Sequence, residues 1–177
     1  DEKINGKNKM TFTKVLGVVK TNYKNKPINL VKLPNNGLIT PWHPIWSSKS
    51  NNWVFPIEEY PNKVLIQSKN LKDNILYNIV CGESHVIIIN SIHCITLGHG
   101  YKNGILDHPY FGTKEVINDL VILNRDKSNY LTIYPEWFVR EGPCLNGSSE
   151  PSISKITPDN IRKSSEEMIR SMVSINV

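Results

Sequence analysis

The sequence has no apolar run of the length that crosses a membrane. A spanning helix needs about 20 consecutive apolar residues, whereas the apolar run at 86–89 ends at Asn90. No basic stretch followed by an apolar one stands at the start, so a secretory signal is not indicated. The chain begins at Asp1 and not at Met, and we expect it to be part of a longer polypeptide. We predict no membrane partner.

Cysteine is scarce and odd in number. The three cysteines are Cys81, Cys94 and Cys144. Such a set argues against a disulfide framework, and it is typical of proteins from a reducing compartment. We therefore expect a cytoplasmic location.

Clustered charge is also missing. The chain has 21 Lys and Arg against 16 Asp and Glu, a net charge of +5. These basic residues are scattered, whereas a nucleic-acid surface gathers them on one face. The lysines near the start suit solvated edge strands, where they discourage pairing between molecules. We predict no nucleic-acid partner, and the 39% hydrophobic content is that of an ordinary globular protein.

Strand signals dominate the first part of the chain and predict a mostly β fold. Residues 10–21 are rich in β-branched and aromatic side chains, and Gly17 indicates a bulge there. The Asn36-Gly37 pair is typical of a hairpin turn between strands at 28–33 and 38–40. A short aromatic strand is expected at 53–56. Three more strands, at 75–80, 85–89 and 92–97, have short connections and predict a β-meander.

The pattern changes after Pro109. Thr113 is a suitable N-cap for a short helix that carries Val116 and Leu120 on one side. A strand at 131–134 follows, and then a stretch at 142–154 whose Gly, Pro and Ser content indicates a linker. Thr157 and Pro158 begin a predicted amphipathic helix. We therefore divide the chain into a β domain at 1–123 and an extension at 124–177 with a linker and a helix.

Two polar residues at the end of the strand at 38–40 are candidate site residues. Thr40 precedes His43 by three positions, and Pro41 and Pro44 hold the intervening loop rigid. An imidazole can protonate a leaving amide nitrogen, and a threonine hydroxyl can hold the peptide. Taken alone, a histidine beside Trp42 and two prolines is more often a structural residue.

His85 and Cys94 are the other candidates. His85 precedes the apolar run at 86–89, and Cys94 lies in the strand that follows. In isolation, a backbone-bound histidine and a buried, inert thiol are the ordinary interpretations of these residues.

A structural zinc site is a rival interpretation. Cys81, His85, Cys94 and His99 would supply two thiolates and two imidazoles, a ligand set that structural zinc takes. The residues between His85 and Cys94 are apolar strand and not loop, which is unusual for such a site. Two further histidines could take a ligand position: His93 and His108.

An ordered series of segments resembles a Hint (hedgehog/intein) domain, most closely the Vint subgroup that accompanies von Willebrand factor A-type domains. The resemblance covers about residues 10 to 123. The segments lie at 38–45, 53–56, 77–80, 85, 90–92, 94 and 96–100, followed by 110–113, 116–117 and 119–120.

The resemblance implies a compact horseshoe of short strands and an autocatalytic, cysteine-type peptide cleavage. In this family an initial Cys or Ser attacks the peptide bond before it, in an N-to-S or N-to-O acyl shift. Thr40 and His43 take the place of the family's Thr-x-x-His. His85 takes that of a second assisting histidine, and Cys94 falls near a cysteine of hedgehog-type members. The implied partner is the chain's own N-terminal flanking domain, which in the Vint subgroup is of von Willebrand factor A type. No cofactor is implied.

The sequence also departs from the family pattern. The strand with the nucleophile is not among these residues, so we expect the chain as given to be inactive. Ile95 and Thr96 stand where an intein would have His-Asn, so asparagine cyclisation is not indicated. Glu58 and Glu59 are the candidates for an activating acid. The alternatives are a Hint-like scaffold without activity and a zinc-stabilised binding module.

Overall fold

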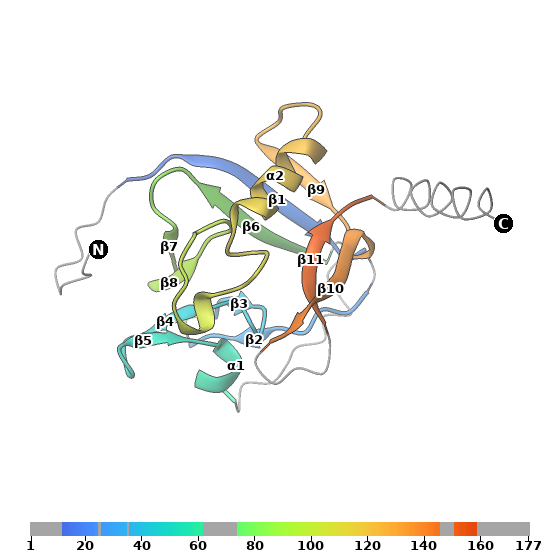
Figure 1. Ribbon diagram of the computed structural model, residues 1–177. Helices are drawn as coiled ribbons and strands as arrows, with labels where there is room; N and C mark the ends of the chain where they lie inside the picture. Colours follow the sequence, from blue (N-terminus) through green and yellow to red (C-terminus); the bar gives the residue numbers. More distant parts are fainter. Residues whose placement is uncertain (1–11, 25, 35, 62–73, 146–150, 159–177) are drawn as a thin grey trace, which may run out of the picture.

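The longest strand of the fold, β1 (Val15–Asn22), is the centre of a three-stranded sheet. Figure 1 shows the computed structural model, which describes residues 12–24, 26–34, 36–61, 74–145 and 151–158. Strand β1 pairs antiparallel with β6 (Ile75–Cys81) and parallel with β9 (Tyr130–Ile133). The register shifts between Val15 and Gly17, which confirms the predicted bulge.

A four-stranded sheet in the order β5-β4-β8-β7 forms the other main part. Its strands are β4 (Ile45–Ser47), β5 (Asn52–Val54), β7 (Val86–Ile89) and β8 (Ile92–Ile95). Neighbouring strands are antiparallel, and Ile45 lies opposite Cys94. The aromatic strand expected near Trp53 is therefore confirmed as part of β5.

The predicted three-stranded meander is wrong. Strands β7 and β8 form the expected hairpin, but β6 lies in the other sheet. It pairs with β1 from Cys81 opposite Val15 to Ile75 opposite Asn22. This long register gives β6 more backbone hydrogen bonds than the short β7 can offer, so the chain changes sheets at residues 82–85.

The smaller elements position the loops between the sheets. Strands β2 (Val31–Lys32) and β3 (Leu38–Ile39) form the predicted hairpin, in which Asn36 has a φ of 63°. Three short helical turns are α1 (Pro56–Glu59), η1 (Gly104–Leu106) and η2 (Pro135–Trp137). In the part of the chain that the structure describes, no helix is long and apolar enough to span a membrane.

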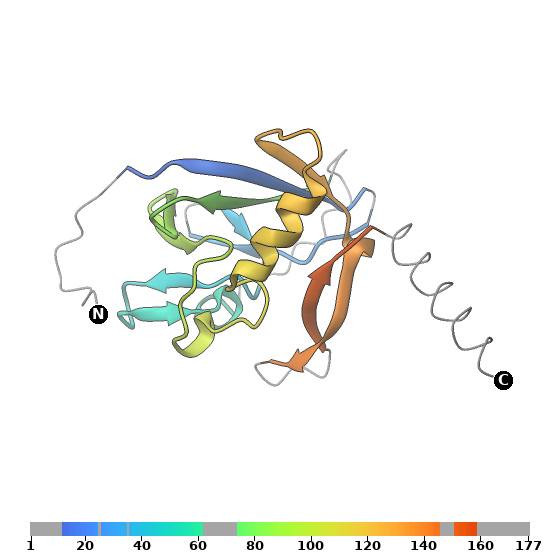
Figure 2. The same ribbon diagram turned by 45° about the horizontal axis from the view of Figure 1, so that its top comes forward.

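Helix α2 (Lys114–Leu123) begins where the sequence predicts. The Thr113 hydroxyl accepts a hydrogen bond from the Glu115 N–H at 3.2 Å, and so satisfies a donor of the first turn. Val116 and Leu120 are buried. Figure 2 shows α2 running across the molecule between the β1 sheet and a terminal hairpin.

That hairpin replaces the linker predicted at 142–154. Strands β10 (Phe138–Cys144) and β11 (Pro151–Ile156) pair antiparallel. The Gly, Pro and Ser content suggested a loop, but Ile153 and Ile156 bury their side chains in the core and hold the segment as a strand. The amphipathic helix expected after Thr157 falls on residues 159–177, outside the described part.

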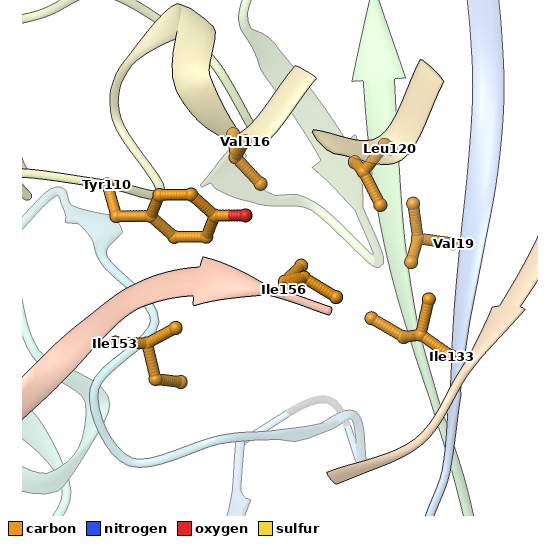
Figure 3. Packing of buried hydrophobic residues seen from close by; sticks show 7 residues of the cluster. All are labelled: Val19, Tyr110, Val116, Leu120, Ile133, Ile153 and Ile156. Atoms are coloured by element: carbon orange, nitrogen blue, oxygen red, sulfur yellow. The ribbon is translucent and has the colours of Figure 1, made fainter. Parts of the chain in front are cut away.

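Residues from both sides of position 123 form one hydrophobic cluster (Figure 3). It joins β1, β9, α2 and β11 through the buried side chains of Val19, Tyr110, Val116, Leu120, Ile133, Ile153 and Ile156. At its edge the Tyr110 hydroxyl donates to Asp119 Oδ2 at 2.7 Å, and the Ile156 N–H donates to the same oxygen at 3.2 Å. One carboxylate therefore ties α2 to β11.

We expect Asp119→Ala to lower the free energy of unfolding by about 2 kcal/mol, because it leaves a buried tyrosine hydroxyl and a strand N–H without their acceptor. Urea unfolding followed by tryptophan fluorescence measures the change. Asp126→Ala, at an exposed position after α2, is the matched control and should stay within about 0.5 kcal/mol of wild type. Equal stabilities for the two variants would contradict this role of Asp119.

Candidate functional site

The Thr40–His43 segment forms a tight turn between β3 and β4. The His43 N–H donates to the Thr40 carbonyl at 3.3 Å. The His43 ring reaches β8, the strand that neighbours β4 in the four-stranded sheet, where its Nε2 lies 2.9 Å from the Ile95 carbonyl oxygen. A carbonyl can only accept, so Nε2 carries the hydrogen. In the neutral ring, Nδ1 is then the nitrogen with a lone pair for a proton.

Burial keeps the His43 imidazole neutral. Desolvation lowers the pKa of His43 below its ordinary value, and the hydrogen bond to Ile95 opposes this shift. At neutral pH the ring is therefore a base with an open Nδ1 and not a cation.

His85 is held by the residue next to Ile95. Its carbonyl accepts from the Thr96 N–H at 2.9 Å and from the Thr96 hydroxyl at 3.1 Å. His43 and His85 are thus attached to consecutive residues at the end of β8. The Nδ1 of His85 is buried and has no hydrogen-bond partner among the described residues. A buried, unsatisfied nitrogen is costly, and such atoms are often found where a ligand group completes the site.

His99 is the residue that links the histidines. Only 7% of its surface is exposed, and its Nδ1 accepts the Tyr101 N–H at 3.0 Å. Burial lowers the pKa of His99 to about 4, and the nearby His85, His108 and His43 add to the shift in that order. The four imidazoles therefore lie close enough for their charges to interact; we call them the histidine cluster.

Tyr101 and His108 complete the surroundings of His99. The Tyr101 ring stacks on His99 with centroids 5.5 Å apart, and it forms a T-shaped pair with His85, whose ring centroid is 6.3 Å away. His108 Nδ1 accepts two backbone N–H groups, from Tyr110 at 3.1 Å and Phe111 at 3.0 Å. Burial lowers the pKa of His108 as well, so three members of the cluster favour the neutral form.

Backbone pairing between two loops fixes His99 in place. The Gly98 N–H donates to Phe111 O at 2.9 Å, and the Gly100 N–H donates to Gly112 O at 2.7 Å. A Cβ on Gly112 would lie 3.1 Å from both Nε2 and Cε1 of His99. The absence of a side chain at 112 therefore makes room for the imidazole.

The Cys94 side chain belongs to a second hydrophobic cluster, with Leu33 and Ile45. Cys94 is 4% exposed, and burial raises the pKa of its thiol to about 11. Cys81 is also buried, with a raised pKa, whereas Cys144 is exposed at the end of β10. A thiol is nucleophilic as the thiolate, so Cys94 and Cys81 are poorly suited to attack a peptide bond at neutral pH.

The ligands of the rival zinc interpretation do not form a metal site. Among the residues that the structure describes, no three His, Cys, Asp or Glu side chains are grouped so that they could hold a metal ion. Cys94 takes part in the second cluster, and His99 Nδ1 is occupied by a backbone N–H. Of the two candidate acids, Glu59 accepts a hydrogen bond from the Ser47 hydroxyl at 2.9 Å.

Sequence reasoning considered His99 and His108 only as metal ligands and did not consider Tyr101. The available signal was the Gly98-His99-Gly100 run, since glycines with positive φ on both sides of a histidine mark a specially built loop. The proximity of His99 to His43 depends on contacts between distant segments, which no local pattern reports.

Comparison with known families identifies a matching family model. The family model called Vint, described as a Hint domain, matches residues 3–144. The match includes the Thr40–His43 turn, both sheets and all of the histidine cluster. No curated protein matches the chain.

Proposed function

This chain belongs to the Vint family of Hint domains, and we propose that it cleaves the peptide bond joining it to its own N-terminal flanking domain by an acyl shift. In the proposed reaction a cysteine or serine attacks the carbonyl carbon of the preceding residue. The resulting ester or thioester is resolved by water, a thiol or an amine. We propose a von Willebrand factor A-type domain as the flanking domain, from the resemblance to the Vint subgroup.

The observation that carries this proposal is the tautomer of His43. With Nε2 donating to the Ile95 carbonyl, Nδ1 takes the proton from the attacking group and then gives it to the leaving amide nitrogen. A lowered pKa suits protonation of the leaving nitrogen, because a weakly basic imidazole has a strongly acidic imidazolium form. Thr40, at the start of the same turn, would hold the peptide beside the ring, and His85 would assist from its place directly before β7.

The nucleophile is proposed to come from a residue before Asp1. The high pKa values of the Cys81 and Cys94 thiols, together with the place of Cys94 in an apolar cluster, argue against either as the attacking group. The role of Cys94 then reduces to filling the core between β4 and β8. The chain of 177 residues should therefore stay intact when incubated alone with a thiol.

We expect His43→Ala to slow cleavage by at least about 100-fold, the usual loss for removal of a general acid–base. The substrate is the native polypeptide with the segment that precedes Asp1, and gel electrophoresis and intact mass follow its cleavage with and without dithiothreitol. His93→Ala is the matched control, since His93 lies on β8 and is not among the residues that shift the pKa of His99. An uncleaved wild-type precursor would favour a scaffold without activity, and equal cleavage rates for wild type and His43→Ala would overturn the role of His43.

A further inference from the structure

Hydrogen bonds to backbone groups fix the tautomers of three histidines in the cluster. His43 donates through Nε2, which leaves Nδ1 as its acceptor. His99 and His108 are in the same tautomer as His43, but they use their nitrogens differently. Their Nδ1 atoms accept backbone N–H groups, so in the neutral rings the hydrogen lies on Nε2 and is available to a further acceptor. The cluster thus combines one base with two neutral donors.

His99 is the better placed of these two donors. Its pKa is lowered by His85, His108 and His43, so it lies within electrostatic range of the other three members of the cluster. His108 uses its Nδ1 to organise the backbone of the 108–111 turn. The Nδ1 of His85 is buried and has no partner among the described residues, and Tyr101 has ring contacts with both His85 and His99.

The donor is also preorganised. Stacking on Tyr101, the hydrogen bond at Nδ1 and the close approach of Gly112 all restrict rotation of the His99 ring. Donors that are already oriented before the reaction stabilise developing negative charge without reorganisation, and removal of one such donor commonly costs about 100- to 1000-fold in rate. Because the His99 ring remains neutral across the working pH range, the strength of its hydrogen bond to the developing charge does not change with pH.

We infer that His99 donates its Nε2–H to the carbonyl oxygen of the scissile peptide bond, and so stabilises the oxyanion of the acyl shift. The inference rests on the proposed function. The sulfur or oxygen nucleophile forms a bond to the carbonyl carbon while its proton passes to His43 Nδ1. The oxyanion accepts the His99 hydrogen bond, and His99 keeps its proton. When the carbon–nitrogen bond breaks, the proton on His43 passes to the leaving nitrogen, which becomes a free amine.

The test compares two variants of similar length, His99→Gln and His99→Met, in the native precursor. Glutamine keeps an N–H donor near the position of Nε2, whereas methionine has none. We expect His99→Met to lower the cleavage rate about 100-fold and His99→Gln to stay within about 10-fold of wild type. The pH dependence should keep its shape in both variants, because the donor does not titrate in the working range.

The outcomes separate this inference from the proposed function. Cleavage of wild type and His99→Met at equal rates overturns the donor role while the proposed function stands. An uncleaved wild type overturns both. Circular dichroism checks that the variants fold. If His99→Met does not fold, long-range ¹H–¹⁵N spectra of the wild type replace it. A proton on Nε2 of His99 from pH 5.5 to 8 supports the inference, and a proton on Nδ1 overturns it.

Discussion

Acidification from pH 7 to pH 4 should destabilise the protein by about 3 kcal/mol through His99 alone. The pKa of this buried imidazole falls from about 6.5 in the unfolded chain to about 4 in the folded one. Between these values the unfolded chain binds more protons than the folded chain, so stability falls as the pH falls. Below about pH 4 both states are protonated, and the loss from His99 stays constant. His43 and His108 also have lowered pKa values and act in the same direction.

Urea unfolding at half-unit steps from pH 7.5 to pH 4 measures this loss. His99→Gln cannot titrate at this position, and we expect it to flatten the curve by about 2–3 kcal/mol over that range. His93→Gln removes a half-buried histidine of β8 that contributes nothing to the shift of His99, so it should leave the curve nearly unchanged. Equal slopes for the two variants would mean that His99 is not the group responsible.

This expected behaviour follows from how the site is built. Its imidazoles come from segments that meet only in the folded chain. Desolvation lowers the pKa values of His43, His99 and His108 there, and repulsion from the other three histidines adds to the shift of His99. Neutral rings are what the proposed chemistry needs, since a base must have a free lone pair and a donor must not lose its proton. The same arrangement makes the folded state sensitive to acid, because protonation places like charges side by side.

Local signals in the sequence were sufficient for the parts of the fold that local physics decides. The Thr113 cap, the bulge at Gly17 and the hairpin around Asn36 each depend on neighbouring residues, and each was predicted correctly. The partner of β6 and the hairpin at β10–β11 depend on distant pairing. There, short connections and a Gly- and Pro-rich composition indicated the wrong structure.

The same distinction applies to the site. Thr40 and His43 share one turn, so a spacing of three residues was enough to propose them together. His99 reaches the cluster only because the 98–100 loop pairs with residues 111–112. In the sequence it looked like one of several possible metal ligands, and its fixed tautomer became visible only with the Tyr101 N–H in place.

Gly98→Ala should lower the free energy of unfolding by about 3 kcal/mol. Gly98 has a φ of +66°, and a Cβ there would lie 2.5 Å from Cγ1 and 2.7 Å from Cδ1 of Ile117. The left-handed backbone costs a non-glycine residue about 1 kcal/mol, and forcing a methyl group into a packed core costs about 1–3 kcal/mol more. Because Ile117 packs against the main cluster, relief of the clash has to move α2 or the Ile117 side chain.

Gly100→Ala separates the two causes. Gly100 has a φ of +73° but nothing within 4 Å of an added Cβ, so this variant should show the backbone cost alone, about 1 kcal/mol. In an Ile117→Ala background the obstructing atoms are gone, and Gly98→Ala should then cost no more than Gly100→Ala does. A double-mutant cycle from urea unfolding measures the coupling, expected at about 2 kcal/mol. A coupling near zero would show that α2 does not depend on the absence of a side chain at position 98.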